Sequence, residues 1–257
     1  MILYQHIIRI STVELTPVTV VVLALSFVWS GFVRGGFGFG GGALMLPFAL
    51  LVVDSPLYIV PLLAVQLIAF SLFNVILYFK NIDWYYLLRF TAILFLPTAA
   101  GVFGLLVLPD RLLMIFLYLI VATYAINYIF PFRIRVQSRW LDLIILFIGG
   151  YLSGSAFTGG PPIAAVAARY IPKQKLRETL LSMWVVIAFM KLPTLYATGI
   201  DLQLQHQLWL FPCVFFGHLM GMRFHDKLIT MQNESFFRAI GIVLLAVTAV
   251  GLSRILL

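Results

Sequence analysis

Ten apolar segments follow one another along the chain, and they constrain the fold more than any other feature. They cover about residues 17–33, 43–53, 56–79, 84–108, 111–131, 140–157, 161–171, 178–199, 204–224 and 236–256. At about 1.5 Å of helix rise per residue, the last three segments of each half can cross about 30 Å of hydrocarbon. The second segment of each half is too short to do so, and the first is borderline. The pattern predicts an all-α membrane protein with about 8–10 transmembrane or half-membrane helices.

The composition agrees with this class. Hydrophobic residues make up 63% of the chain and charged residues only 10%, whereas a soluble domain has about 45–50% apolar and about 25% charged residues. The net charge of +8 is typical of a membrane protein, because lysine and arginine collect in cytoplasmic loops. We therefore expect the lipid bilayer as a partner, and no nucleic acid.

The residues that metal sites and enzymes need are scarce. The chain has one cysteine and four scattered histidines, which supply neither a metal cluster nor a nucleophile–base pair. We expect no cofactor, no metal, no catalytic residues and no enzymatic activity. The nine acidic residues all lie in loops or near segment ends. This placement argues against a cation substrate and against proton coupling through a buried carboxylate.

The two halves of the chain resemble each other. "SGFVRGGFGFGGG" near residue 30 is similar to "GGYLSGSAFTGGPP" near residue 149, so that Gly41 meets Gly160 at a shift of 119 residues. Asp83 meets Asp201 at a shift of 118, and "PDRL" meets "HDKL" at a shift of 116. Such an ordered series indicates a tandem repeat. The expected units are an N-terminal segment at 1–16, a first helical repeat at 17–131, a central cytoplasmic loop at 132–139 and a second helical repeat at 140–257.

The distribution of positive charge predicts the orientation. If each short segment returns the chain to the side it came from, one side collects most basic residues, including Lys80 and Lys173, and the other has Arg9, Arg111 and Arg254. The positive-inside rule makes the first side cytoplasmic. We therefore expect a multi-pass protein of the inner membrane with both termini outside and the second half inverted. The pattern leaves open whether the segments 43–53 and 161–171 span or re-enter.

A glycine-rich stretch separates the two short segments in each half. In lipid, unpaired backbone groups cost several kcal/mol, and paired broken helices in inverted halves mark binding sites in transporters. Amides at the start of a half-helix can bind an anion. Close helix packing is the alternative, and it suits the four-residue spacing of Gly31 and Gly35. The residues we expect at the substrate are Gly38, Gly40, Gly41, Gly42, Thr158, Gly159 and Gly160.

Two basic residues lie deep in the apolar sequence, where a charge is expensive and usually functional. Arg34 lies between the first two short segments, and Lys191 lies well inside the segment 178–199. Either could add positive charge at the substrate. Arg34 could instead pair with backbone carbonyls at the end of the first short helix, and Lys191 could reach the outer surface.

Polar uncharged residues complete the candidate site. Gln66 and Asn74 are eight residues apart, close to one face of the segment 56–79. They line the cavity or form hydrogen bonds between helices. His218 lies inside the segment 204–224, where a lone buried histidine is more often structural than a proton carrier.

Several of these stretches resemble the TauE/SafE family of sulfite and organosulfonate exporters. The similar stretches are "GFGFGGGALMLP" (37–47), "NIDW" (81–84), "GYLSGSAFTGGPP" (150–162) and "KLRETLLSMWVV" (175–186). The resemblance covers about residues 18 to 255. It departs from the family at Thr-Gly-Gly-Pro-Pro, where a longer glycine run is common, and in the short central loop. It implies export of a small sulfur-containing anion.

Taken together, the residues and the resemblance predict a secondary transporter, most simply an exporter, of a small anion such as sulfite, a sulfonate or another organic acid. Alternating access of the two inverted halves would move it. An anion channel and a non-transporting membrane scaffold remain as alternatives, and the sequence leaves open whether the chain forms a homo-oligomer.

Overall fold

The computed structural model describes residues 15–131, 138–230 and 234–257, and within these residues the chain forms helices and no strands. The helices are α2 (Pro17–Phe37), α3 (Gly41–Ala49), α4 (Pro56–Leu77), the short 3-10 helix η1 (Phe79–Asn81), α5 (Trp84–Val107), α6 (Asp110–Ile129), α7 (Arg139–Ala156), α8 (Gly160–Tyr170), α9 (Lys173–Ala197), α10 (Leu204–Thr230) and α11 (Glu234–Leu256). The predicted segment 1–16 and loop 132–139 lie almost wholly outside the described residues.

Helix starts follow local chemistry. The Thr16 hydroxyl accepts the Thr19 N–H (3.2 Å) and Pro17 fills the first turn of α2, as expected at a helix N-terminus. Asp83 caps α5 through the Tyr86 N–H. Its counterpart in the repeat, Asp201, accepts the N–H of the residue two positions on, just before α10. The two matching aspartates therefore do similar work in the two halves.

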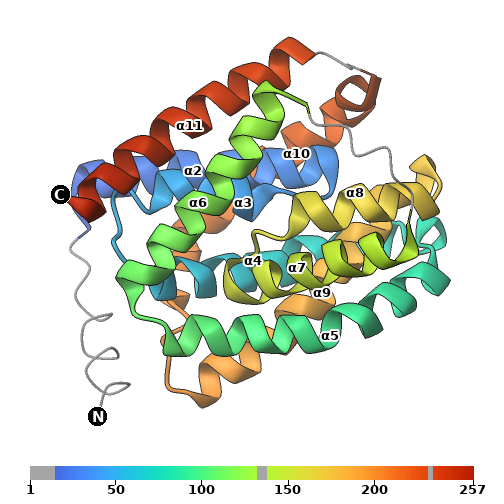
Figure 1. The fold of residues 1–257 in the computed structure, drawn as a ribbon, viewed down its shortest axis with the longest axis horizontal. Helices are drawn as coiled ribbons and strands as arrows, with labels where there is room; N and C mark the ends of the chain where they lie inside the picture. Colours follow the sequence, from blue (N-terminus) through green and yellow to red (C-terminus); the bar gives the residue numbers. More distant parts are fainter. Residues whose placement is uncertain (1–14, 132–137, 231–233) are drawn as a thin grey trace.

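The helices pair in a pattern that is unchanged when the halves are exchanged (Figure 1). Helix α2 packs along α10, and its counterpart α7 packs along α5, which is the counterpart of α10. The self-related pairs α4–α9, α6–α11 and α3–α8 are also in contact. Two repeated halves related by a two-fold axis require such a pattern. Their inverted orientation in the membrane stays a prediction.

Glycines bring the α2–α10 and α5–α7 pairs close together. A Cβ atom on Gly154 would lie 2.1 Å from the Thr98 carbonyl oxygen, and one on Gly217 would lie 2.0 Å from that of Val28. A Cβ on Gly35 would lie 2.5 Å from a carbonyl oxygen of α10. These contacts are typical of small-residue packing between membrane helices, and they confirm the packing role predicted for this spacing.

Six described helices are long and apolar enough to cross a membrane: α2, α4, α5, α6, α9 and α11. Five of the six segments predicted to span are among them. The borderline first segment also qualifies, whereas α10 does not. Helix α10 was expected to end at residue 224 but continues to Thr230, so "HDKL" lies inside a helix while "PDRL" spans the start of α6. Helices α3 and α8, with 9 and 11 residues, reach only about 14 and 16 Å, as expected of half-helices.

The two interrupted helix pairs meet in the interior. A Cβ on Gly160, the first residue of α8, would lie 2.8 Å from the backbone nitrogen of Gly40, which precedes α3. A Cβ on Gly42 would lie 2.8 Å from the carbonyl oxygen of Phe157, which ends α7. The starts of α3 and α8 are therefore in direct contact.

Candidate functional site

The first break lies between α2 and α3. Helix α2 continues four residues beyond its expected end, to Phe37, and is closed by Gly38, whose N–H donates to the Arg34 carbonyl (2.8 Å). Gly38 and Gly40 have φ values of 79° and 81°, in the left-handed region that glycine adopts without steric cost. These two glycines allow the chain to end α2 and begin α3 at Gly41 within three residues.

The second break, between α7 and α8, is built differently. Its left-handed residue is Phe157, with φ 58°, which costs about 1–2 kcal/mol for a residue with a Cβ. The Phe157 N–H donates to the Ser153 carbonyl (3.0 Å), and the Thr158 N–H donates to the Leu152 carbonyl (3.2 Å). The end of α7 is therefore closed by its own backbone.

A cavity of about 20 Å³ lies where the two breaks meet. Its lining includes five of the predicted site residues: Arg34, Gly40, Gly41, Gly42 and Gly160. Sequence reasoning did not assign the six other lining residues to the site: Ser30, Phe39, Leu63, Leu67, Phe157 and Trp184. No carboxylate lines this cavity.

Arg34 supplies the charge at the cavity. Because α2 extends to Phe37, Arg34 lies in the last turn of that helix and not between two helices as predicted. It is 3% exposed, and its Nε and Nη2 atoms have no hydrogen-bond partner within the described part of the chain. Its guanidinium lies 5.6 Å from the centroid of the Phe70 ring. A buried charge without an opposite charge is costly. An anion in the cavity could accept hydrogen bonds from these two donor atoms.

The start of α3 adds backbone donors. The first N–H groups of a helix have no partner inside it, and the first backbone bond that closes α3 runs from the Leu44 N–H to the Gly40 carbonyl (2.9 Å). No side chain caps the start of α3. The amides of Gly41 and Gly42 therefore lie at the cavity together with the positive end of the helix dipole.

The start of α8 offers less. Pro161 and Pro162 occupy its first turn and have no N–H to donate. The Ile163 N–H already donates to the Gly159 carbonyl (3.2 Å). Gly160 is thus the residue through which α8 can present an amide to the cavity.

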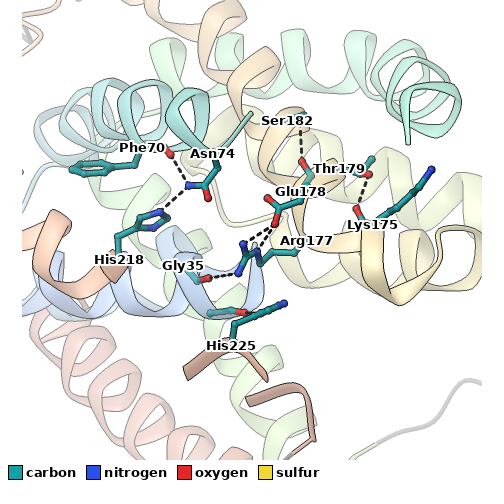
Figure 2. Close-up of polar contacts among 11 residues, drawn as sticks. Gly35, Phe70, Asn74, Lys175, Arg177, Glu178, Thr179, Ser182, His218 and His225 are labelled. Atoms are coloured by element: carbon teal, nitrogen blue, oxygen red, sulfur yellow. Dashed lines mark hydrogen bonds and ion pairs between the residues drawn. The ribbon is translucent and has the colours of Figure 1, made fainter. Parts of the chain in front are cut away.

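Two predicted polar residues of α4 lie outside the lining. Gln66 Nε2 donates to Oε1 of Gln207 on α10 (3.1 Å). Asn74 Nδ2 donates to the Phe70 carbonyl (2.9 Å) and lies 2.8 Å from Nε2 of His218 (Figure 2). Both therefore act between helices, which is the alternative that the sequence left open.

Lys191 and Thr158 serve the end of α7. Lys191 is fully buried, so it does not reach the surface; its Nζ donates to the Ser153 carbonyl (3.1 Å) and lies 3.8 Å from the centroid of the Phe157 ring. The Thr158 hydroxyl donates to the Leu152 carbonyl (3.1 Å). Neither residue lines the cavity.

The remaining predicted glycines also have structural roles. The Gly38 carbonyl accepts a hydrogen bond from Nε1 of Trp184 (2.8 Å). A Cβ on Gly159 would lie 1.8 Å from the Gly149 carbonyl oxygen, so Gly159 is required for packing. The position of Trp184 could have been predicted from its spacing. It lies seven residues from both Arg177 and Lys191, so the three side chains share one face of α9.

A comparison with known protein families decides the class. The family model described as "Sulfite exporter TauE/SafE" matches residues 23–252. This chain belongs to the TauE/SafE family. The match includes both breaks and every residue of the cavity lining. No curated protein and no solved structure matches the chain.

Membership in the TauE/SafE family agrees with the helices described above. The family is one of membrane transporters, and six described helices could cross a membrane; together they indicate a multi-pass membrane transporter. In the described residues, no three His, Cys, Asp or Glu side chains come together in a way that could hold a metal ion.

Proposed function

We propose that this TauE/SafE protein transports a small oxyanion, such as sulfite, a sulfonate or another organic acid, and that the anion binds at the first helix break. The observation that carries the proposal is Arg34, which is buried beside the cavity with two donor atoms unpartnered. The free amides of Gly41 and Gly42 lie at the same cavity. A guanidinium and a helix start both favour an anion with two or more oxygen atoms.

The size of the cavity supports alternating access. A volume of about 20 Å³ holds about one water molecule, and a sulfur oxyanion is several times larger. Binding therefore requires the two breaks to move apart. Because α2 and α3 belong to one half and α8 to the other, rocking of the halves would open the site to one side of the membrane and then to the other.

The membrane potential is a sufficient driving force for export. It favours anion exit from a negative interior by about 2.3 kcal/mol per charge for each 100 mV. No coupling ion is then needed, in keeping with a cavity lining that contains no carboxylate.

Binding is tested by thermal denaturation of the purified protein with sulfite, thiosulfate, taurine, sulfoacetate and simple carboxylates as sodium salts. We expect saturable stabilisation by at least one oxyanion, with chloride as the matched salt control. Stabilisation by none of them, together with stabilisation by a cation, would overturn the proposal.

Transport is tested with the best-binding anion in proteoliposomes. We expect flux that follows the imposed potential and is independent of a pH gradient at fixed potential. Flux that needs a proton gradient with the potential clamped would overturn the uncoupled mechanism but leave the anion site standing.

A further inference from the structure

An incomplete ion pair lies at the start of α9. Nε and Nη2 of Arg177 lie 2.9 and 2.6 Å from Oε1 of Glu178. Consecutive residues of a helix do not face each other, so both side chains bend to meet. Both nitrogens use the same oxygen, whereas an arginine fork normally binds both oxygens of a carboxylate.

The second oxygen of Glu178 is left over. Glu178 is 5% exposed, and its Oε2 atom has no hydrogen-bond partner among the described residues. His225 of α10 is a titratable group near Glu178, but its Nδ1 lies 2.5 Å from the Gly36 carbonyl oxygen and is hydrogen-bonded to it. A buried, unsatisfied carboxylate oxygen is costly, so this pair is easier to displace than a complete one.

The Arg177 side chain lies next to Gly35, close to the first break (Figure 2). Its Nη1 lies 3.5 Å from the Gly35 carbonyl oxygen, and its side chain fills the space where a Cβ of Gly38 would be. Trp184, which lines the cavity and bonds to Gly38, is seven residues further along α9, or about 10 Å. Arg177 therefore lies beside the same helix break as Arg34, on the side predicted to be cytoplasmic.

We propose that Arg177 is an entry residue for the anion and that Glu178 is a tethered competitor, which holds Arg177 until a substrate anion displaces it. The substrate then offers two oxygens to the guanidinium where Glu178 offers one. From Arg177 the anion passes to Arg34 as the break opens.

The test is calorimetric binding of sulfite to the full-length protein carrying Glu178→Gln. If Glu178 competes with the substrate, sulfite binds roughly tenfold more tightly than to wild type, which corresponds to about 1.4 kcal/mol. If Glu178 only holds Arg177 in place, sulfite binds more weakly, and that result overturns the competitor role.

Asp142→Asn is the matched control. Asp142 forms the other ion pair of the described chain, with Arg169 (2.5 Å), and its second oxygen accepts the Tyr170 hydroxyl (2.5 Å). It is a complete pair and does not line the cavity, so its removal should leave sulfite affinity unchanged. An equal gain in affinity in both variants would show a general charge effect and would overturn the specific role of Glu178.

A second pair of variants keeps the test decisive if Glu178→Gln folds poorly. Glu178→Asp retains the charge on a shorter side chain that reaches Arg177 less well, so it should also bind sulfite more tightly. Arg177→Gln should bind it more weakly. Where Glu178→Gln does fold, adding it to Arg177→Gln should restore nothing. These roles rest on the proposed anion transport, so sulfite binding by the wild-type protein is measured first. If wild type binds neither sulfite nor any other oxyanion, both proposals fail. If wild type binds sulfite and Glu178→Gln leaves the affinity unchanged, only the competitor role of Glu178 fails.

Discussion

The two helix breaks occupy matching positions in two similar stretches of the sequence, yet they differ in how their polar groups are used. At the second break, Lys191 and Thr158 donate to the last carbonyls of α7, and the Tyr124 hydroxyl donates to the Thr158 carbonyl (3.0 Å). At the first break, two donor atoms of Arg34 have no partner among the described residues, and no side chain caps the start of α3. A duplicated motif can therefore give one half a binding role and the other a supporting role.

Backbone chemistry explains much of the difference. The first break places glycines where α3 begins, so amides remain available for a ligand. The second places Pro161 and Pro162 where α8 begins, which removes donors but fixes the helix start. This difference supports the proposal that the anion binds at the first break, with the second break forming the other side of the cavity.

The largest effect should separate the two breaks by stability. In Gly159→Ala the new Cβ would lie 1.8 Å from the Gly149 carbonyl oxygen, so we expect a loss at or above the ~3 kcal/mol upper end for overpacking. In Gly40→Ala the nearest atom is 3.6 Å away, and the cost is the left-handed backbone alone, about 1–2 kcal/mol. Detergent-solubilised yield and thermal denaturation measure both; equal losses would contradict the proposed difference between the breaks.

The next effect should be on affinity. Arg34→Met removes the free donors, and loss of a hydrogen bond to a charged group costs about 1.5–3 kcal/mol, so we expect roughly 10- to 150-fold weaker binding of the preferred oxyanion. The melting temperature should not fall, because an unpartnered buried charge is removed. Calorimetry and thermal denaturation report the two quantities separately. Unchanged affinity in a folded variant would remove Arg34 from the site.

Lys191→Met is the matched change at the second break. It removes the Lys191 hydrogen bond from the Ser153 carbonyl, which keeps the Phe157 N–H (3.0 Å). A net hydrogen bond is worth about 0.5–1.5 kcal/mol, so we expect a modestly lower melting temperature. Anion affinity should stay within about twofold of wild type, since Lys191 does not line the cavity. A large loss of affinity with normal stability would instead return Lys191 to the substrate.

The smallest effect should come from Thr158→Val. The Leu152 carbonyl loses the Thr158 hydroxyl but keeps the Thr158 N–H and the Ser155 hydroxyl (3.1 Å), so we expect a cost of about 0.5–1 kcal/mol. Anion affinity and flux should not change. Measured flux that falls tenfold would mean that this hydroxyl binds the anion.

The sequence predicted the all-α membrane class and the family correctly, and it assigned Gly31 and Gly35 to packing, which their contacts with α10 confirm. The assignment of the later glycines to the substrate stays a prediction. The end of α2 was predicted wrongly. A run such as "VRGG" has little helix propensity by itself, but Gly35 and Gly36 stay helical because they pack on α10 and their carbonyls meet Arg177 and His225. Tertiary contacts therefore outweighed the low local helix propensity, and Arg34 is part of α2 for the same reason.

The lining of the cavity was only partly predictable for the same reason. Residue type and spacing were enough to select five residues that line the cavity: Arg34, Gly40, Gly41, Gly42 and Gly160. Gln66 and Asn74 looked equally suitable, but their amides meet groups on α10 and α4. Residue type tells what a side chain can bind, and only its neighbours determine what is left for a ligand.

The sequence by itself determined the apolar segments and the two breaks between them, because hydrophobicity, glycine and proline act over a few neighbouring residues. The tertiary structure alone decided which buried cation is free. Lys191 and Arg34 are both deep and both basic, but the Lys191 ammonium donates to a carbonyl of α7, whereas two donor atoms of Arg34 have no partner among the described residues and lie beside a cavity. That outcome depends on atoms from helices far apart in the chain coming within about 3 Å of each other.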